Sequence, residues 1–198
     1  MPFARDRAEY SELAATVAAA LLPGLRLPHQ VLRTVNARTR FFEFEELFEA
    51  PLWHAVKDLA KDWRDTELIG VVLDPDPEQY FYAEFGYYGA LRAPIESIGR
   101  ELPELLAHEP PGSPADSLLT NGRVMAFATI SRSVVIWAER EMGLGIVQLR
   151  DGFASSFERA RQVRWFTTEE ALELMAPSFS GQTVPPDFAR EFLDNYSA

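Results

Sequence analysis

Two short segments of the chain combine aromatic rings with carboxylates. The first, YFYAEFGYY, begins at Tyr80, and the second, SVVIWAERE, begins at Ser133. Alternate side chains of a β-strand point to opposite faces, so the first segment would place three tyrosines and one carboxylate on a single face. These residues are Tyr80, Tyr82, Glu84 and Tyr88. Tyrosine joins an apolar ring to a polar tip and is enriched at protein interfaces, so the pattern predicts a binding surface.

The second segment offers a similar face. If it is a strand, Trp137 and Glu139 point to the same side, and the two segments form one surface if they share a sheet. Aromatic rings would cover the stems of Arg or Lys, and carboxylates would pair with their charges. We therefore predict that six residues bind a basic partner: Tyr80, Tyr82, Glu84, Tyr88, Trp137 and Glu139. The alternative is that helices cover this face and only the polar tips reach water.

Catalytic chemistry has little support in the sequence. The chain contains no cysteine, which excludes thiolate zinc sites, disulfides and a cysteine nucleophile. His29, His54 and His108 lack the spacing of metal ligands, and no phosphate-binding loop or nucleophile elbow is present. Ser131 and Ser133 carry hydroxyls, but neither stands in a recognisable strained turn. We expect no metal, no cofactor and a binding protein rather than an enzyme.

The net charge of −11 is concentrated in the middle of the chain. Residues 1–40 carry +3, residues 41–110 carry −11 and residues 111–198 carry −3. This charge would repel phosphates, which argues against nucleic-acid binding, and would steer a basic protein towards the chain. The longest apolar run, LAATVAAALLPGL, is too short to cross a membrane and contains a Pro-Gly pair. We expect no membrane association and a cytoplasmic location.

These observations favour a non-enzymatic acidic binding protein that occupies a basic protein partner. A bacterial immunity-type protein, which neutralises a toxin acting on nucleic acid or another anionic substrate, would fit. The segment LPHQVLRTVNARTRFFEFEEL, residues 27–47, resembles the helix-then-strand opening of a superfamily of small immunity proteins. The resemblance covers about a tenth of the chain and lacks the glycine pair of that superfamily, so it assigns no residue a role.

Two other functions stay open. One is a small-molecule-binding domain or enzyme, which requires a concave site with a perturbed carboxylate. Its pocket would be lined by Tyr82, Glu84, Tyr88 and Trp137. The other is a structural or assembly subunit that forms homo-oligomers through an exposed strand edge.

An α+β fold must position these residues. Helical periodicity predicts helices at residues 5–22, 51–63, 94–108, 167–175 and 185–196. Period-two patterns predict strands at residues 68–73, 80–85, 123–130, 133–141, 144–151 and 162–166, with DPDPEQ as the turn of the first hairpin. Short connections favour an antiparallel sheet of about five to seven strands, with helices packed mainly on one face. Residues 1–198 would form a single domain, with a subdomain boundary near residues 108–121 as the alternative.

Overall fold

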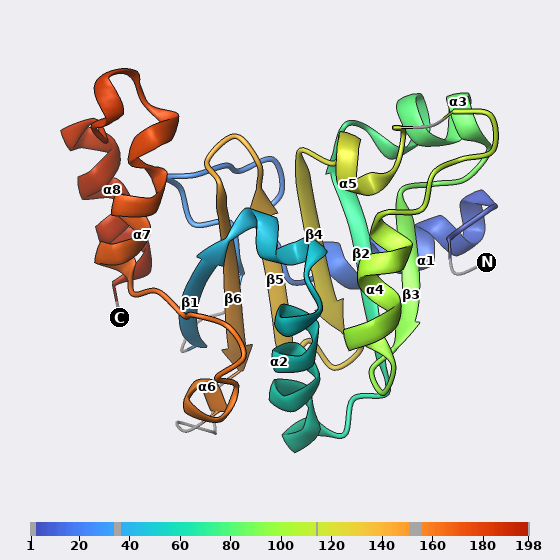
Figure 1. Ribbon diagram of the computed structural model, residues 1–198, viewed down its shortest axis with the longest axis horizontal. Helices are drawn as coiled ribbons and strands as arrows, with labels where there is room; N and C mark the ends of the chain where they lie inside the picture. The colour runs from blue at the N-terminus through green and yellow to red at the C-terminus, as the bar shows by residue number, and fades with distance from the viewer. Residues whose placement is uncertain (1–2, 34–36, 114, 151–155, 198) are drawn as a thin grey trace.

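A six-stranded antiparallel sheet forms the centre of the protein (Figure 1). The computed structural model describes residues 3–33, 37–113, 115–150 and 156–197. The strand order is β1-β6-β5-β4-β2-β3. The strands are β1 (Ala37–Glu43), β2 (Glu67–Asp74), β3 (Ala90–Pro94), β4 (Val124–Thr129), β5 (Val134–Glu139) and β6 (Leu144–Arg150). The predicted α+β class and antiparallel sheet are confirmed.

Helices and short helical turns connect the strands. The longer helices are α1 (Arg7–Ala18), α2 (Ala50–Ala60), α4 (Ile98–Leu106), α7 (Thr168–Met175) and α8 (Pro186–Tyr196). The shorter turns are η1 (Phe44–Phe48), η2 (Lys61–Trp63), η3 (Pro77–Tyr82), α3 (Ala83–Phe85), α5 (Leu118–Asn121), α6 (Ser156–Arg159), η4 (Ala176–Ser178) and η5 (Ser180–Gln182). Helix α7 begins with a capping box, in which the side chains of Thr167 and Glu170 each accept a hydrogen bond from the other's backbone amide. No helix within the described ranges is long and apolar enough to cross a membrane.

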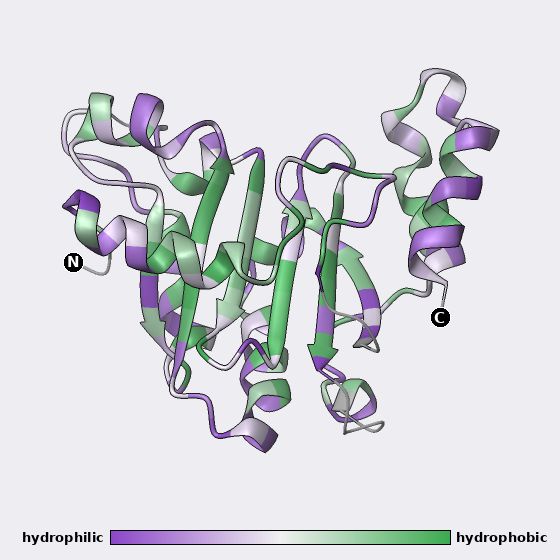
Figure 2. Cartoon of the chain, turned by 180° about the vertical axis from the view of Figure 1, so that it is seen from behind, coloured by the Kyte–Doolittle hydropathy of each residue, from purple (hydrophilic) through white to green (hydrophobic). Residues whose placement is uncertain are grey.

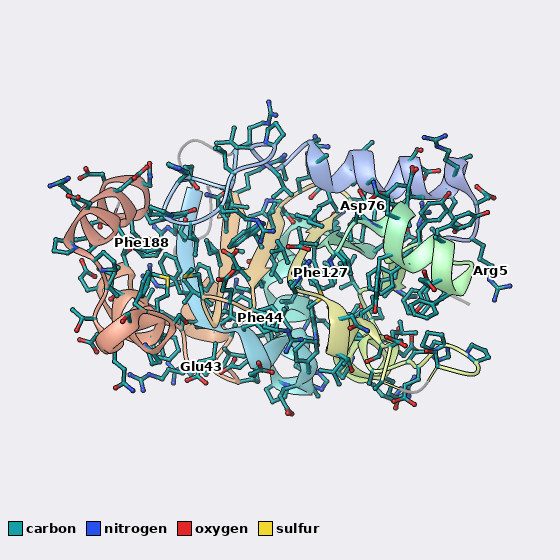
Figure 3. All side chains as sticks on the ribbon, turned by 90° about the horizontal axis from the view of Figure 1, so that it is seen from above. Arg5, Glu43, Phe44, Asp76, Phe127 and Phe188 are labelled. Atoms are coloured by element: carbon teal, nitrogen blue, oxygen red, sulfur yellow. The ribbon has the colours of Figure 1, made fainter. Side chains whose placement is uncertain are left out.

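The helices lie on both faces of the sheet, which corrects the expectation that they gather mainly on one. Helices α2 and α4 bury Trp53 and Leu102 against one face, whereas α1, α7 and α8 bury Leu13, Met175 and Phe192 against the other. Figure 3 shows α1 on one side of the sheet and α2 with α4 on the opposite side. The central strands β4 and β5 are buried along their whole length. Strands that are apolar on both faces need a covering layer on each side.

The sheet contains strands from both halves of the chain. Strand β2 pairs with β4 and strand β1 pairs with β6, so strands from before and after residues 108–121 are interleaved. The two core clusters also combine both halves, since one contains Leu52 with Val134 and the other Leu13 with Ile146. Residues 108–121 therefore run between strands of one sheet.

Residues 80–85 do not form the predicted strand. They lie within the helical turns η3 and α3, because Asp76 caps the start of η3 and Pro77 occupies its first position. The Asp76 side chain accepts hydrogen bonds from the two backbone amides that follow Pro77, at 2.9 and 2.8 Å. Strand β2 pairs instead with β3, which begins at Ala90. The alternating aromatic pattern favours a strand, but the capping signal that precedes it decides the local structure.

Both edge strands are partly covered by neighbouring segments. The predicted strand at residues 162–166 is reduced to Phe166, which forms an isolated bridge with Phe41 on β1. At the other edge, Phe3 forms an isolated bridge with Leu91 on β3. These contacts use backbone groups that an open edge would present to another chain.

The segment at residues 19–33, which follows α1, crosses one face of the sheet in an irregular conformation. It folds back on itself after α1, because the backbone amide of Leu22 donates to the carbonyl of Val31 at 2.9 Å. Helix α8 holds the segment in place. The hydroxyl of Tyr196 donates to the carbonyl of His29 and accepts from the amide of Val31. Figure 2 shows α1 lying across this apolar face of the sheet.

Candidate ligand-binding cavity

The six residues predicted to form one binding face lie in different environments. Three are buried: Tyr88, Trp137 and Glu139. Three lie on the helical turns η3 and α3, where side-chain directions do not follow the alternation of a strand: Tyr80, Tyr82 and Glu84. The six side chains therefore do not share one open surface.

Tyr82, Tyr88 and Tyr10 form a continuous stack of rings. The ring centroids of Tyr82 and Tyr88 are 4.5 Å apart at an interplanar angle of 17°, and those of Tyr10 and Tyr88 are 4.5 Å apart at 8°. Tyr82 is 44% exposed at one end of the stack, and Tyr88 is buried between its two neighbours. The stack thus connects η3 to α1, the helix that carries Tyr10.

Tyr80 and Glu84 lie apart from this stack. The ring of Tyr80 packs edge-on against Phe81 and Phe85, next to the core that α2 and α4 cover. Its hydroxyl donates to Asp116 Oδ1 at 3.1 Å. Glu84 is exposed on α3. Neither side chain reaches the sheet face that carries Trp137.

The strand register places Trp137 and Glu139 in two successive rows on the α1 face of the sheet. Trp137 lies in a row with Val71, and Glu139 lies in the next row with Val124 and Asp74. Paired residues of neighbouring strands point to the same face. A β-bulge shifts the register of β2 just before Asp74, so its carboxylate points to the same side as Val124.

An apolar cavity of about 460 Å³ lies over the first of these rows. Its floor includes Trp137 and Val71, and Tyr10 lines it from α1. Leu25 and Leu73 also line it, and each is 39% exposed. They are two of the four large apolar side chains that the described ranges leave exposed, so apolar surface is concentrated at the opening of this cavity.

A second hollow of about 370 Å³ adjoins the cavity at the next row. Charged side chains alone line it: Arg26, Asp74, Arg123, Glu139, Arg140 and Glu141. Arg26 lines both spaces. Its guanidinium donates to Glu139 Oε1 and to Asp74 Oδ2, each at 2.8 Å. The second oxygen of Asp74 accepts from Arg123 at 2.6 Å, so Asp74 joins the two arginines.

Glu139 is the most buried charge in this hollow, with a side chain only 7% exposed. Burial raises the pKa of the Glu139 carboxyl, and the neighbouring guanidinium of Arg26 opposes this rise. Its Oε2 atom accepts no hydrogen bond from any described residue. A buried carboxylate oxygen without a donor is costly, which makes this atom a candidate contact for a ligand.

The serines near the β4–β5 turn do not form a catalytic triad. The hydroxyls of Ser131 and Ser133 both donate to Asp65 Oδ2, and the amide of Ser131 donates to Oδ1 at 3.0 Å. No histidine is hydrogen-bonded to these three residues in the part of the chain that is described. Asp65 therefore holds the turn, and the arrangement lacks the base that a serine nucleophile needs. No cluster of acidic and histidine side chains suited to a metal ion occurs within the described ranges either.

The sequence patterns missed Tyr10 and Arg26, which line the cavity from outside the sheet. Tyr10 lies within the helix predicted at residues 5–22, and the helical pattern alone assigns it no site. The Pro23-Gly24 pair was a usable signal, because it forms a turn with Gly24 at positive φ, five residues after α1 ends at Ala18. Arg26 is the first charged residue after this turn.

No family model, curated protein or solved structure matches this chain. The short resemblance of residues 27–47 to an immunity-protein superfamily therefore transfers no function, and the functional inference depends on the geometry of the cavity.

Proposed function

We propose that this chain is a non-enzymatic binding protein for a small molecule with an apolar body. The observation that carries the proposal is the cavity of about 460 Å³ between α1, residues 21–26 and the sheet. Ligand pockets are commonly about 300–1,000 Å³, mostly apolar and supplied with a few polar groups that orient the ligand. Here Trp137 and Tyr10 provide aromatic walls, and Arg26 provides the polar boundary.

Binding of a neutral solvatochromic dye tests this function. Ala18 lines the cavity and is exposed on α1, so Ala18→Phe would place a ring in its opening. We expect dye affinity to fall about tenfold or more. Ala15→Phe is the matched control, because Ala15 is exposed on the same helix but does not line the cavity. Absence of dye binding by the wild-type protein, or an equal loss in both variants, would contradict the proposal.

A separate observation favours a second function, the occupation of a basic protein partner such as a toxin. Glu43, Glu45 and Glu49 are exposed on and around η1. Burial, followed by the charges of Glu43 and Glu49, raises the pKa of Glu46 to about 7. Acids crowded in this way form a negative patch that a cationic surface would neutralise. The patch adjoins α2, on the opposite side of the sheet from the cavity.

The product of the adjacent gene is the first partner to test for this second function. Binding should be faster at low salt than at physiological salt, because screening weakens the attraction between the opposite charges. A double variant, Glu43→Gln with Glu45→Gln, should lower the association rate constant. Glu169→Gln with Glu173→Gln removes two exposed charges from α7 and serves as the control. No binding of the wild-type chain at low salt, or equal rate changes in both double variants, would exclude this partner.

A further inference from the structure

The charged hollow contains one acceptor that the chain itself leaves unused. Glu139 Oε1 accepts a hydrogen bond from Arg26, whereas Oε2 accepts none from the described residues. The side chain is more than nine-tenths buried and lines the hollow that adjoins the apolar cavity. An ionised carboxylate oxygen in such a place is best matched by a charged donor.

Arg140 does not supply this missing donor, because it is engaged elsewhere. Its guanidinium donates to the backbone carbonyls of Leu119 and Gly122 and lies over the ring of Phe44, 4.7 Å from the centroid. Its nearest carboxylate is Glu45, at 3.8 Å. The positive charge of Arg140 is therefore directed towards η1 and away from Glu139.

The six side chains that line the hollow are three arginines and three carboxylates, but Arg140 directs its guanidinium towards η1. Arg26 and Arg123 face the carboxylates of Asp74, Glu139 and Glu141. Asp74 binds both arginines, and Glu141 makes no ion pair with any described residue. Burial, together with the charges of Glu141 and Asp74, also raises the pKa of Glu139 against the effect of Arg26. A cation beside Glu139 Oε2 would offset the acidic charges that surround this carboxyl.

We propose that the ligand is an amphiphilic amine, whose ammonium group donates to Glu139 Oε2 while its apolar body fills the cavity beside Trp137. This inference rests on the proposed small-molecule function. The two spaces share Arg26 as a lining residue, and three neighbouring segments contribute to both: Leu73 and Asp74 on β2, Arg123 and Val124 at the start of β4, and Trp137 and Glu139 on β5. One ligand can therefore reach the apolar floor and the carboxylate together.

An anionic amphiphile is the main competing class. Its carboxylate would meet the like charges of Asp74, Glu139 and Glu141, and both Arg26 and Arg123 already donate to Asp74. A neutral alcohol could donate to Glu139 Oε2 but would bring no positive charge to this carboxylate. Ligands that share an apolar chain but differ in head group therefore distinguish these three classes.

Competition between a bound solvatochromic dye and three probes of equal chain length tests the inference. The probes are n-octylammonium, n-octanol and n-octanoate, each used below its aggregation concentration at neutral pH. We expect octylammonium to bind the wild-type protein about tenfold more tightly than octanol, since hydrogen bonds to charged groups exceed neutral ones by this order. Octanoate should bind most weakly.

Variants then identify the acceptor. Glu139→Gln should abolish the preference for octylammonium over octanol while octanol affinity changes less than about threefold. Glu173→Gln removes an exposed charge from α7, away from both spaces, and should keep the preference. If the wild-type protein binds octylammonium and octanol with equal affinity, the ligand is not selected for an amine, whatever the variants show. The proposed binding of an apolar small molecule in the cavity would still stand. If none of the three probes displaces the dye, the proposed small-molecule function is itself contradicted.

Discussion

Two carboxyl groups of this protein depart from the behaviour of ordinary surface acids. Burial is the largest cause of the raised pKa at both Glu46 and Glu139. At Glu139 the guanidinium of Arg26 opposes the shift, whereas at Glu46 the further contributions come from acids and add to it. Glu46 is therefore the clearer position at which to measure how far a buried carboxylate with no cation beside it lowers the free energy of unfolding.

Replacement of Glu46 by Gln should stabilise the protein in mildly basic solution. With a folded-state pKa of about 7 against 4.5 for the ordinary group, the folded chain retains a proton that the unfolded chain has lost. The free energy of unfolding of the wild-type protein should therefore fall as pH rises from about 4.5 to about 7. We expect Glu46→Gln to remove this pH dependence and to raise the free energy of unfolding by about 1 kcal/mol above pH 7. The gain stays this small because the group is half-buried and solvent screens its charge.

Urea denaturation over this pH range measures the effect. Glu45→Gln, which removes an exposed charge from the same helical turn, separates burial from net charge. If both variants raise the free energy of unfolding equally, long-range repulsion between acids, and not burial of Glu46, causes the effect.

Among the elements, the irregular segment at residues 19–33 depends on α8 for its position. The carbonyl of Pro28 accepts from Asn195, and the side chain of Gln30 donates to the carbonyl of Asn195. Tyr196 adds the two hydrogen bonds to His29 and Val31, and burial raises the pKa of its hydroxyl. Since Val31 lines the cavity, the C-terminal helix supports a cavity wall that is distant in sequence.

Tyr196→Phe should loosen this wall. It leaves the amide of Val31 without its acceptor, so we expect a loss of about 1–2 kcal/mol in the free energy of unfolding. The affinity of this variant for the dye should also fall. Tyr82→Phe removes a hydroxyl from an exposed ring and should change stability by less than about 0.5 kcal/mol. An unchanged dye affinity in Tyr196→Phe would show that α8 does not support the cavity.

At the scale of the whole molecule, the covered strand edges and the net charge both oppose self-association. Phe166 bridges to the edge of β1 and Phe3 to the edge of β3, and each molecule carries a charge of −11. We expect light scattering to report the monomer mass of 22.4 kDa over a wide concentration range. Salt should not change this mass, because covered edges persist when charge repulsion is screened. A stable dimer would revive the assembly-subunit hypothesis.

Much of the fold could be predicted from local patterns. The predictions of α1, α2, α7 and α8 and of strands β2, β4, β5 and β6 are confirmed, because each has a clear period or a cap within a few residues. The prediction at residues 80–85 was wrong because Asp76 and Pro77 start a helical turn that the aromatic alternation obscured. The placement of helices on both faces is set by contacts between distant elements, which a local pattern does not contain.

The sequence by itself determined two residues of the candidate site, Trp137 and Glu139, but not how the site is assembled. It established the acidic charge and the absence of cysteine, and it placed Trp137 and Glu139 on one side of a strand. Only the tertiary structure buried that side beneath α1 and brought Arg26 to Glu139, 113 residues apart in the chain. Burial and the pairing of charges depend on which distant segments pack together, and strand alternation specifies only the direction of a side chain.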